Sequence, residues 1–329
     1  MATSKSWRGA ALTRLGLGAA QFGNLNRVTT DEESTLAVDA AWDAGIRYFD
    51  TAPHYGLGLS ERRLGAALRG RPRAEYVLST KVGRLLVPRG EPTELLDDAG
   101  FVVPADHLRV WDFSRDGILR SLEQSLERLG TDRIDIAYMH DPDDHWQQAS
   151  TTGIETLIEL RDQGVLAAVG AGMNQSALLA DLVRRTDVDV VMVAGRWTLL
   201  DQSAAEDLLP AASQRGVRVV AAGIYNSGLL SEPTVSDDAH FDYREAPVQI
   251  VERARRIAAA CERHGVTLPE AAVQFPFRHP AVASVVVGTR TAAHVSSLVT
   301  RSTAPVPDEL WTDLVDDGLV PAVAIEQGT

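Results

Sequence analysis

Short apolar runs alternate with amphipathic segments along most of the chain. Runs of about four to eight β-branched, aliphatic or aromatic residues between turn residues are typical of strands, and apolar positions spaced three and four apart are typical of helices. These patterns predict seven clear strands, at 46–50, 76–81, 134–139, 167–169, 188–193, 217–221 and 284–287.

Amphipathic segments between the strands predict helices. The first follows Thr30, which has a glutamate three residues later, the spacing of a capping box, and it is expected to end at Gly45. The others are expected at 59–68, 121–129, 154–162, 176–185, 204–214, 249–263 and 269–275.

Strand and helix alternate at least seven times, with no internal repeat and no linker-like change of composition. This order is typical of parallel βαβ units. A chain of 329 residues with this pattern fits a single α/β domain over 1–329, a (β/α)8 TIM barrel, better than two domains. The eighth strand is expected between Leu230 and Ala281. An excursion at about 85–115, which bears proline and glycine, is expected to be a structureless loop that covers the substrate.

Composition and charge narrow the class of protein. The hydrophobic content of 45% and charged content of 23% are globular values, and the net charge of −13 argues against a nucleic-acid or anionic-membrane partner. The single cysteine, Cys261, excludes a disulfide framework, and the histidines lack metal-ligand spacing, so no metal is expected. Residues 1–14 lack the apolar segment of a secretory signal, and no apolar run is long enough for a membrane span. These features predict a cytoplasmic protein and leave a homo-oligomer open.

Two glycines near the N-terminus, Gly16 and Gly18, superficially match a dinucleotide-binding loop. The third glycine is missing at the required spacing, position 21 is a glutamine, no clear strand precedes the glycines and no helix opens after them. These differences exclude the doubly wound nucleotide-binding fold.

Polar residues stand at the ends of three consecutive predicted strands. Asp50 ends the first, Lys81 the second and His140 the third, and Tyr55 lies in the loop after the first. Because the carboxyl ends of barrel strands meet at one face, these four residues are expected to lie together. A lysine and an aspartate alone would also fit a structural ion pair, but the added tyrosine and histidine favour a catalytic site.

The chemistry suited to this group is acid–base catalysis by tyrosine. A free tyrosine has a pKa of about 10, too high for easy proton exchange near neutrality. An ammonium group within hydrogen-bond reach favours the phenolate and lowers that pKa. Asp50 would keep Lys81 charged and oriented, and His140 would hydrogen-bond the reacting oxygen or the tyrosine. The group therefore suits proton transfer on a hydroxyl or carbonyl while a hydride moves elsewhere.

Residues 45–61 resemble the signature of the aldo-keto reductases, Gly-x-x-Tyr-Phe-Asp-Thr-Ala-x-x-Tyr-Gly-x-Gly-x-Ser-Glu. Residues 79–83 and 138–142 match the lysine and histidine motifs of that family, and 288–291 resemble its late cofactor motif. The resemblance covers nearly the whole chain. It implies a barrel, a nicotinamide cofactor bound in extended form, and a catalytic tetrad of Asp50, Tyr55, Lys81 and His140.

Shorter stretches resemble the aldose 1-dehydrogenase branch of the family, which includes L-fucose and D-threo-aldose dehydrogenases and the related pyridoxal 4-dehydrogenases. These stretches are 110–114, 140–144, 172–175, 196–202 and 226–230.

The resemblance also implies cofactor contacts. Asn174 is the candidate for holding the nicotinamide amide, Ala194 stands where a glutamine is expected, and Tyr225 is the candidate for the ring that stacks on the nicotinamide. Arg290 is the one certain cation near the late motif; NADP users often carry more cations there, so NAD is modestly favoured over NADP. The full candidate set is Gly18, Ala20, Asp50, Asn174, Tyr225, Asn226, Gly228, Leu229, Gly288, Thr289, Arg290 and His294.

Four residues are candidates for substrate contacts: His54, Trp111, Asp141 and Trp197. Aromatic faces pack on the C–H surfaces of pyranoses, so both tryptophans could line a sugar site, with packing in the core or a lid as the alternative for each. Asp141 could accept hydrogen bonds from substrate hydroxyls.

These observations predict an NAD(P)-dependent oxidoreductase that oxidises the anomeric hydroxyl of a small aldose, of the L-fucose or D-threo-aldose type, to a lactone. One alternative is an NADPH-dependent reductase of aldehydes, ketones or pyridoxal-like carbonyls. Another is a non-catalytic nucleotide-sensing subunit, against which the intact tetrad counts.

Overall fold

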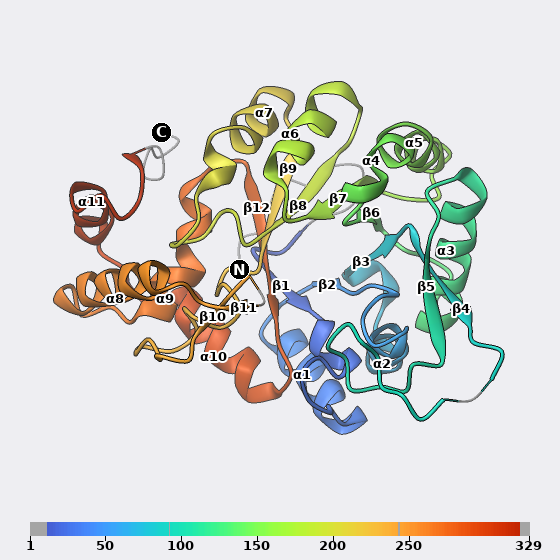
Figure 1. Cartoon of the computed structure of the whole chain (residues 1–329), viewed down its shortest axis with the longest axis horizontal. Helices are drawn as coiled ribbons and strands as arrows, with labels where there is room; N and C mark the ends of the chain where they lie inside the picture. Colours follow the sequence, from blue (N-terminus) through green and yellow to red (C-terminus); the bar gives the residue numbers. More distant parts are fainter. Residues whose placement is uncertain (1–11, 92, 243, 323–329) are drawn as a thin grey trace.

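Eight parallel strands close a barrel in the computed structural model, which describes residues 12–322 except 92 and 243. Around the barrel the order is β1-β12-β9-β8-β7-β6-β3-β2, so chain neighbours are also neighbours in space (Figure 1). The predicted TIM barrel is confirmed. Its strands are β1 (Leu15–Gly18), β2 (Tyr48–Asp50), β3 (Val77–Val82), β6 (Ile136–His140), β7 (Ala168–Met173), β8 (Val190–Ala194), β9 (Arg218–Ala222) and β12 (Val282–Gly288).

Helices lie outside the barrel and cover the outer faces of its strands (Figure 1). The first begins as predicted, with a capping box in which Thr30 and Glu33 each bond the backbone N–H of the other. The helices are α1 (Asp31–Asp43), α2 (Leu59–Leu68), α3 (Arg115–Leu129), α4 (Trp146–Gln148), α5 (Ile154–Asp162), α6 (Ser176–Arg185), α7 (Leu208–Arg215), α8 (Val248–Arg263), α9 (Leu268–Gln274), α10 (Ala292–Thr303) and α11 (Asp308–Asp316). Shorter or wider helical turns are η1 (Ala20–Gly23), η2 (Arg73–Glu75), η3 (Asp143–His145), η4 (Ala149–Gly153), η5 (Ser203–Ala205) and η6 (Phe275–Arg278).

The eighth strand is β1, so its predicted place between Leu230 and Ala281 is wrong. That stretch instead holds α8, α9 and a small antiparallel pair, β10 (His240–Phe241) and β11 (Arg244–Glu245). The glycines that obscured β1 are required by packing, since a Cβ on Gly16 would lie 2.7 Å from the ring of Tyr48. Because the barrel interior has no room for a larger side chain at this position, β1 lacks the β-branched residues by which a strand is usually predicted.

The excursion after β3 is not structureless as predicted. Strand β4 (Arg84–Pro88) pairs antiparallel with β5 (His107–Trp111), and further along the excursion Phe101 forms an isolated bridge with Leu25. Phe101 is buried in a small apolar cluster with Leu57 and Leu86. Local backbone pairing, which periodicity did not reveal, therefore gives this segment regular structure.

Two cores stabilise the barrel. The larger lies between the strands and the surrounding helices, whereas a smaller cluster fills the barrel interior and includes Leu12, Tyr48, Ile136, Tyr138 and Met192. No helix within the described ranges is long and apolar enough to cross a membrane. Residues 1–11, which carry most of the segment used to predict the absence of a secretory signal, lie outside the described residues.

Candidate active site

Three neighbouring strands deliver polar side chains to the carboxyl end of the barrel. Asp50 is the last residue of β2, His140 is the last of β6, and Lys81 is next to last in β3. All three are at most 5% exposed. Tyr55 follows in the loop after β2, and its ring lies 5.7 Å from that of His140. The four residues predicted from the sequence are therefore brought together.

Lys81 is the centre of this group. Its Nζ donates to Oδ2 of Asp50 at 2.7 Å, to the carbonyl oxygen of Thr51 at 3.0 Å and to the hydroxyl oxygen of Tyr55 at 3.1 Å. An ammonium has three protons, so each one has an acceptor. Burial by itself lowers the pKa of Lys81, but the charges and hydrogen bonds of Asp50 and Tyr55 together outweigh it, and the pKa is raised. The lysine is therefore held charged with its proton aimed at Tyr55.

Two effects oppose each other at Tyr55. Burial raises the pKa of its hydroxyl, and the Lys81 ammonium lowers it, with a net shift upward. The lysine thus acts in the direction expected from the sequence, but it does not overcome desolvation in the free protein. Because the tyrosine oxygen accepts from Lys81, its own proton points elsewhere and is available for transfer.

The two histidines of the site are neutral. Burial, reinforced by the charge of Arg84, holds the pKa of His140 well below its usual range, and burial lowers that of His54 to about 2. Their rings lie 5.5 Å apart, and Nδ1 of each is buried without a partner among the described residues. Neutral imidazoles with unsatisfied nitrogens are suited to hydrogen-bond a polar ligand.

Arg84 joins this group although the sequence did not single it out. It follows the lysine motif directly at the start of β4, donates to the carboxylate of Asp141 and lies over the ring of Trp111, 4.3 Å from the centroid. Trp111 is partly exposed. Burial raises the pKa of Asp141, and the charge of Arg84 opposes that shift. The available signal was its position three residues after Lys81.

The excursion after β3 packs against Tyr55 through Phe101. The ring of Phe101 lies 6.1 Å from that of Tyr55 and 5.3 Å from that of His54. Arg109 of β5 fixes this arrangement, because it forms a two-bond ion pair with the buried Asp97 and donates to the carbonyl of His54 at 3.1 Å. An apolar side chain thus lies beside the rings of Tyr55 and His54.

A cradle of small residues lies beside Asp50. Gly18 of β1 pairs with both Gly288 of β12 and Asp50 of β2, and a Cβ on Gly288 would lie 2.5 Å from the side chain of Gln21. Oε1 of Gln21 and Oγ1 of Thr289 are buried without partners within the described residues. Gln21 was missed from the sequence, where it served only as evidence against a nucleotide fold. The glycines let the Gln21 side chain lie directly against this backbone, and the cradle offers unsatisfied acceptors to a bound molecule.

Arg290, a predicted cofactor contact, is held by a neighbouring segment of the chain. It is 7% exposed, and its guanidinium donates to the carbonyl oxygens of Leu25 and Arg27 and to the hydroxyl of Thr29. These acceptors belong to the segment between η1 and α1. Arg290 therefore ties two segments of the fold together, and its contact with a cofactor stays a prediction.

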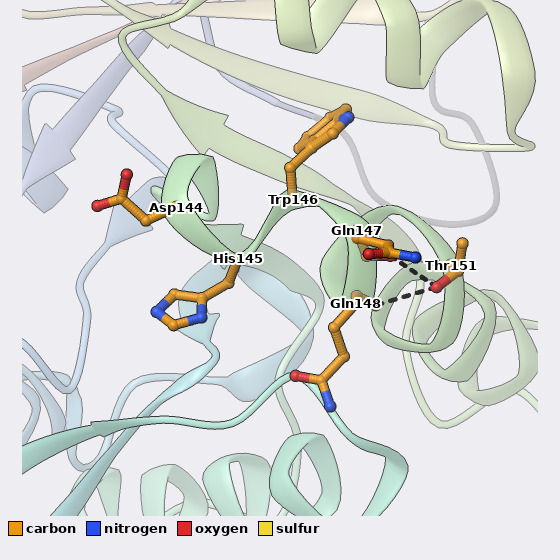
Figure 2. Close-up of a pocket in the computed structure, with 6 residues that line it drawn as sticks. All are labelled: Asp144, His145, Trp146, Gln147, Gln148 and Thr151. Carbon is orange, nitrogen blue, oxygen red and sulfur yellow. Dashed lines mark hydrogen bonds between the residues drawn. The ribbon is translucent and has the colours of Figure 1, made fainter.

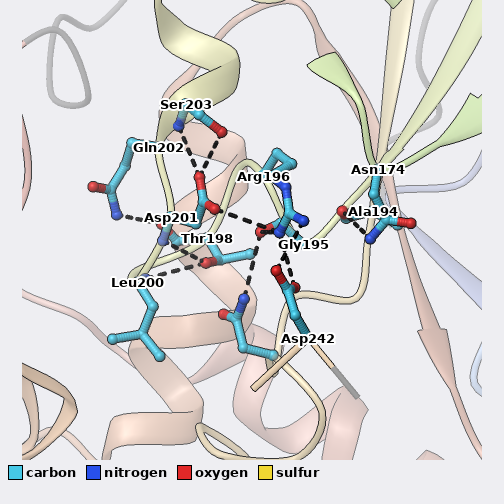
Figure 3. A network of polar contacts seen from close by, with 11 residues as sticks. Asn174, Ala194, Gly195, Arg196, Thr198, Leu200, Asp201, Gln202, Ser203 and Asp242 are labelled. Carbon is cyan, nitrogen blue, oxygen red and sulfur yellow. Dashed lines mark hydrogen bonds and ion pairs between the residues drawn. The ribbon is translucent and has the colours of Figure 1, made fainter. Parts of the chain in front are cut away.

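Asn174, after β7, and Asn226, in the turn after β9, each donate to a backbone carbonyl at or just after the end of β8. The amide nitrogen of Asn174 donates to the carbonyl of Ala194 at 3.1 Å (Figure 3), and that of Asn226 donates to the carbonyl of Gly195 at 3.4 Å. The buried Oδ1 of Asn226 has no partner in the described part of the chain. Both amides remain candidates for cofactor contact.

The same network anchors the β10–β11 turn. Arg196 donates twice to Asp242 at 2.9 Å and also pairs with Asp201, so it joins the loop after β8 to this turn (Figure 3). Such a bidentate pair fixes orientation as well as distance.

The remaining cofactor candidates lie near the same face or its helices. Ala20 begins η1, and Gly228 and Leu229 lie in the turn after β9 that Asn226 enters. His294 lies in the first turn of α10, and burial and the charge of Arg290 lower its pKa. Tyr225 packs against the main core. Burial raises the pKa of its hydroxyl, and Arg301 of α10 lowers it. These contacts give no support to its predicted stacking role.

Trp197 packs in the core, which is the alternative to a sugar-facing position that the sequence left open for it. Its side chain is 1% exposed, its ring lies 5.0 Å from that of Phe275, and its indole nitrogen donates to the carbonyl of Pro276 at 2.9 Å. The polar atom and apolar faces of this tryptophan are thus satisfied within the core.

A hollow beside η3, α4 and η4 is lined by Asp144, His145, Trp146, Gln147, Gln148 and Thr151 and has a volume of about 440 Å³. Figure 2 shows that these side chains fan outward from the helical segment instead of converging. It is therefore a surface hollow rather than the catalytic pocket. The hollow approaches the site through His145, whose ring lies 5.0 Å from that of Trp111.

The closed barrel with a lysine–aspartate–tyrosine cluster at the carboxyl ends of its strands defines a (β/α)8-barrel enzyme. Residues 14–316 match the Aldo/keto reductase family, and the chain belongs to this family. It is an oxidoreductase acting on CH–OH donors, which removes support from the non-catalytic alternative.

Named relatives agree with the family. The chain is 46% identical over 316 residues to D-threo-aldose 1-dehydrogenase from a Pseudomonas species, covering 95% of this chain and 96% of that protein. It is 38% identical over 330 residues to pyridoxal 4-dehydrogenase from Microbacterium luteolum, again covering 95% and 96%. Among solved structures, the holo form of an aldo-keto reductase from Bacillus halodurans superposes with a TM-score of 0.75 at 25% identity, covering 98% of this chain and 97% of that one.

Proposed function

We propose that this protein is an aldose 1-dehydrogenase, which oxidises the anomeric hydroxyl of a small aldose to a lactone with a nicotinamide nucleotide. The similarity to D-threo-aldose 1-dehydrogenase supports the substrate class. The observation that carries the proposal is the Lys81 ammonium, which contacts both the Asp50 carboxylate and the Tyr55 hydroxyl. This contact is what a tyrosine general base requires.

Tyr55 is proposed to take the proton of the anomeric hydroxyl. As the C1–H bond breaks, its electron pair leaves with the hydride, the C1–O bond becomes the carbonyl of the lactone, and the proton moves to the tyrosine oxygen. Lys81 favours the phenolate that accepts this proton, and Asp50 holds Lys81 charged. His140, buried and neutral, is proposed to donate a hydrogen bond to the substrate oxygen and so to orient it.

The residues beside Asp50 fit a nicotinamide nucleotide. The Gly18–Gly288 cradle gives close backbone approach, and the unsatisfied oxygens of Gln21, Thr289 and Asn226 suit the donors of such a molecule. The bound nicotinamide would accept the hydride from C1. Asn174 is proposed to hold its amide group.

We infer a preference for NAD over NADP. The guanidinium of Arg290 already donates to three neutral acceptors in residues 25–29, so it is poorly placed to form a two-bond contact with a 2′-phosphate. His294 adds no charge near neutral pH, since its pKa is lowered by burial.

Three side chains are proposed to hold the sugar. The Asp141 carboxylate, oriented by Arg84, would accept from substrate hydroxyls, and the partly exposed face of Trp111 would pack on a C–H surface of the ring. His54, neutral and with Nδ1 unsatisfied, would complete the contacts.

The test is the absorbance of reduced cofactor with NAD or NADP and a panel of aldoses, L-fucose first. Reduction of NAD with an aldose, lost in Tyr55→Phe and kept in Tyr76→Phe, is the expected result. Tyr76 is a matched control because it packs on Trp42 and Phe49 outside the site. Turnover by Tyr55→Phe at the wild-type rate would overturn the mechanism.

The second candidate is oxidation of pyridoxal, and the similarity to pyridoxal 4-dehydrogenase favours it. The same panel separates the two functions. Reduction of cofactor by pyridoxal without turnover of any aldose would replace the first proposal by the second.

A further inference from the structure

A second layer of polar side chains lies directly beneath the site, inside the barrel. Side chains two residues apart on a strand point to the same face. The residues two positions before Asp50, Lys81 and His140 are Tyr48, Ser79 and Tyr138, and each carries a hydroxyl. All three hydroxyl-bearing residues are fully buried.

These hydroxyls form a continuous chain that ends on Asp50. The hydroxyl oxygens of Tyr138 and Tyr48 are 3.1 Å apart, Oγ of Ser79 is 3.2 Å from the Tyr48 oxygen, and Oγ of Ser79 is 2.6 Å from Oδ1 of Asp50. The other carboxylate oxygen, Oδ2, accepts from Lys81. Both oxygens of Asp50 are therefore held by different partners.

Ser79 is the direct donor to Asp50. Its one hydroxyl proton is shared unequally between Oδ1 of Asp50 at 2.6 Å and the hydroxyl oxygen of Tyr48 at 3.2 Å, and the shorter contact to the charged acceptor is the stronger. Tyr48 and Tyr138 share a further hydrogen bond between their hydroxyls. Burial raises the pKa of both tyrosines, so their hydroxyls stay protonated and remain donors.

We propose that Ser79, Tyr48 and Tyr138 are positioning residues, a chain of linked hydroxyls that fixes the Asp50 carboxylate through Ser79 and thereby holds Lys81 against Tyr55. The chain acts on the reaction without touching substrate. It rests on the proposed roles of Tyr55 and Lys81 but not on the identity of the substrate.

The surroundings favour positioning over proton release. Beyond Tyr138 the interior is closed by apolar side chains that include Leu12, Ile136 and Val190. A proton passed inward would meet no acceptor among these side chains. In a low-dielectric interior, linked hydroxyls instead strengthen one another's hydrogen bonds, including the one from Ser79 to Asp50. The chain thus stabilises negative charge on Asp50 and restricts rotation of its carboxylate.

The expected effect on Tyr55 follows from charge. With fewer donors on Asp50, more of its negative charge acts on the neighbouring phenol, so the phenolate is less favoured and proton abstraction requires a higher pH. Other charged or titratable groups face this tyrosine and stay in place in the variants. They are Lys81, Arg84, Arg109, His54, His140 and Asp141.

The test compares Ser79→Ala, Tyr48→Phe and Tyr138→Phe under saturating cofactor and substrate. We expect kcat to fall by about tenfold, about fivefold and about twofold in that order. Each substitution removes one hydroxyl, and the removed hydroxyl lies further from Asp50 each time. The rising limb of log kcat against pH should move to higher pH in the same order. KM for the substrate should change less than kcat.

Two controls separate this role from simple packing. Tyr76→Phe removes a tyrosine hydroxyl outside the site, and Ser125→Ala removes a buried serine on α3 that accepts from Arg128. Both should leave the pH profile unchanged. Because the tyrosine variants keep the ring, they remain informative if Ser79→Ala does not fold.

The proposal would be overturned if the variants of the hydroxyl chain had a lowered melting temperature but a wild-type kcat and pH profile. The three hydroxyls would then have only a packing role. That failure is distinct from failure of the catalytic assignment. In the latter case Tyr55→Phe would itself be active, whereas here it would stay inactive while the chain variants behaved as wild type.

Discussion

The guanidinium of Arg84 lies over the indole of Trp111, with 4.3 Å between the guanidinium carbon and the ring centroid. The two residues are register partners at the ends of β4 and β5, and Arg84 also pairs with Asp141 after β6. The β-hairpin and the barrel are thus joined at the edge of the site by a cation shared between an aromatic face and a carboxylate.

Arg84→Met should raise KM for the aldose by about tenfold or more and change kcat less. The variant leaves Asp141 without the partner that orients it, and a hydrogen bond to a charged group contributes about 1.5–3 kcal/mol. Initial rates against sugar concentration measure both constants. Arg115→Met, which breaks an exposed pair with Glu159, is the matched control. An unchanged KM in Arg84→Met would place sugar recognition elsewhere.

Tyr55→Phe should lower kcat/KM by about 10²–10⁴, the usual contribution of a positioned acid–base group. The ring stays, so packing against Phe101 and binding of the nucleotide should persist. Stopped turnover together with normal nucleotide binding, followed by quenching of tryptophan fluorescence, is the expected pair of results. Weak nucleotide binding in this variant would instead point to a binding role for the hydroxyl.

Dehydrogenase activity should rise with pH through the alkaline range. The proposed base is active when deprotonated, and burial raises the pKa of Tyr55 above its ordinary value of about 10, so the rate is small below that pKa and grows as pH approaches it. Lys81→Met removes the ammonium that opposes this shift and should move the limb further upward.

The two histidines of the site, His54 and His140, should add no ionisation near neutral pH to the pH–rate profile. The pKa of His140 lies well below its usual range, so the imidazole is neutral throughout the assay. A limb of log kcat/KM centred near pH 6.5 that disappears in His140→Asn would contradict this.

Asp97→Asn should loosen the excursion that carries Phe101. The side chain of Asp97 is 2% exposed and forms two bonds to Arg109, so its loss leaves a poorly compensated cation. Trypsin should cleave faster after Arg89 or Arg109, and KM for the aldose should rise. Asp106→Asn, which alters an exposed contact with His107, provides the comparison. Equal cleavage rates in the two variants would exclude the clamp.

Arg290→Gln should lower stability by about 1–3 kcal/mol, since three acceptors in residues 25–29, one of them buried and two partly buried, lose a charged donor. The ratio of kcat/KM for NAD to that for NADP should stay nearly constant. Thermal unfolding and initial rates measure the two effects, with the exposed Arg27→Gln as control. A selective loss of NADP activity would restore the phosphate-binding role.

Sequence reasoning located Asp50, Lys81 and His140 because each ends a strand, and the carboxyl ends of parallel barrel strands share one face. It failed at β1, where Gly16 accommodates the ring of Tyr48 and erases the usual strand signal. It also did not decide between a site and a core position for Trp197, and it did not reveal the partners of Arg290, because the polar atoms of both residues are satisfied by backbone from distant segments. Residue type alone does not reveal which partner a long side chain reaches.

By itself, the sequence determined the alternation of strands and helices, the family and the strand-end positions of the lysine, aspartate and histidine, because these follow from local periodicity and short motifs. Only the tertiary structure decided that Arg84 binds Asp141, that Phe101 faces Tyr55, and that hydroxyls two positions below the site form a chain to Asp50. These contacts join residues from different strands and loops, so barrel closure and side-chain volume, rather than local pattern, bring them together.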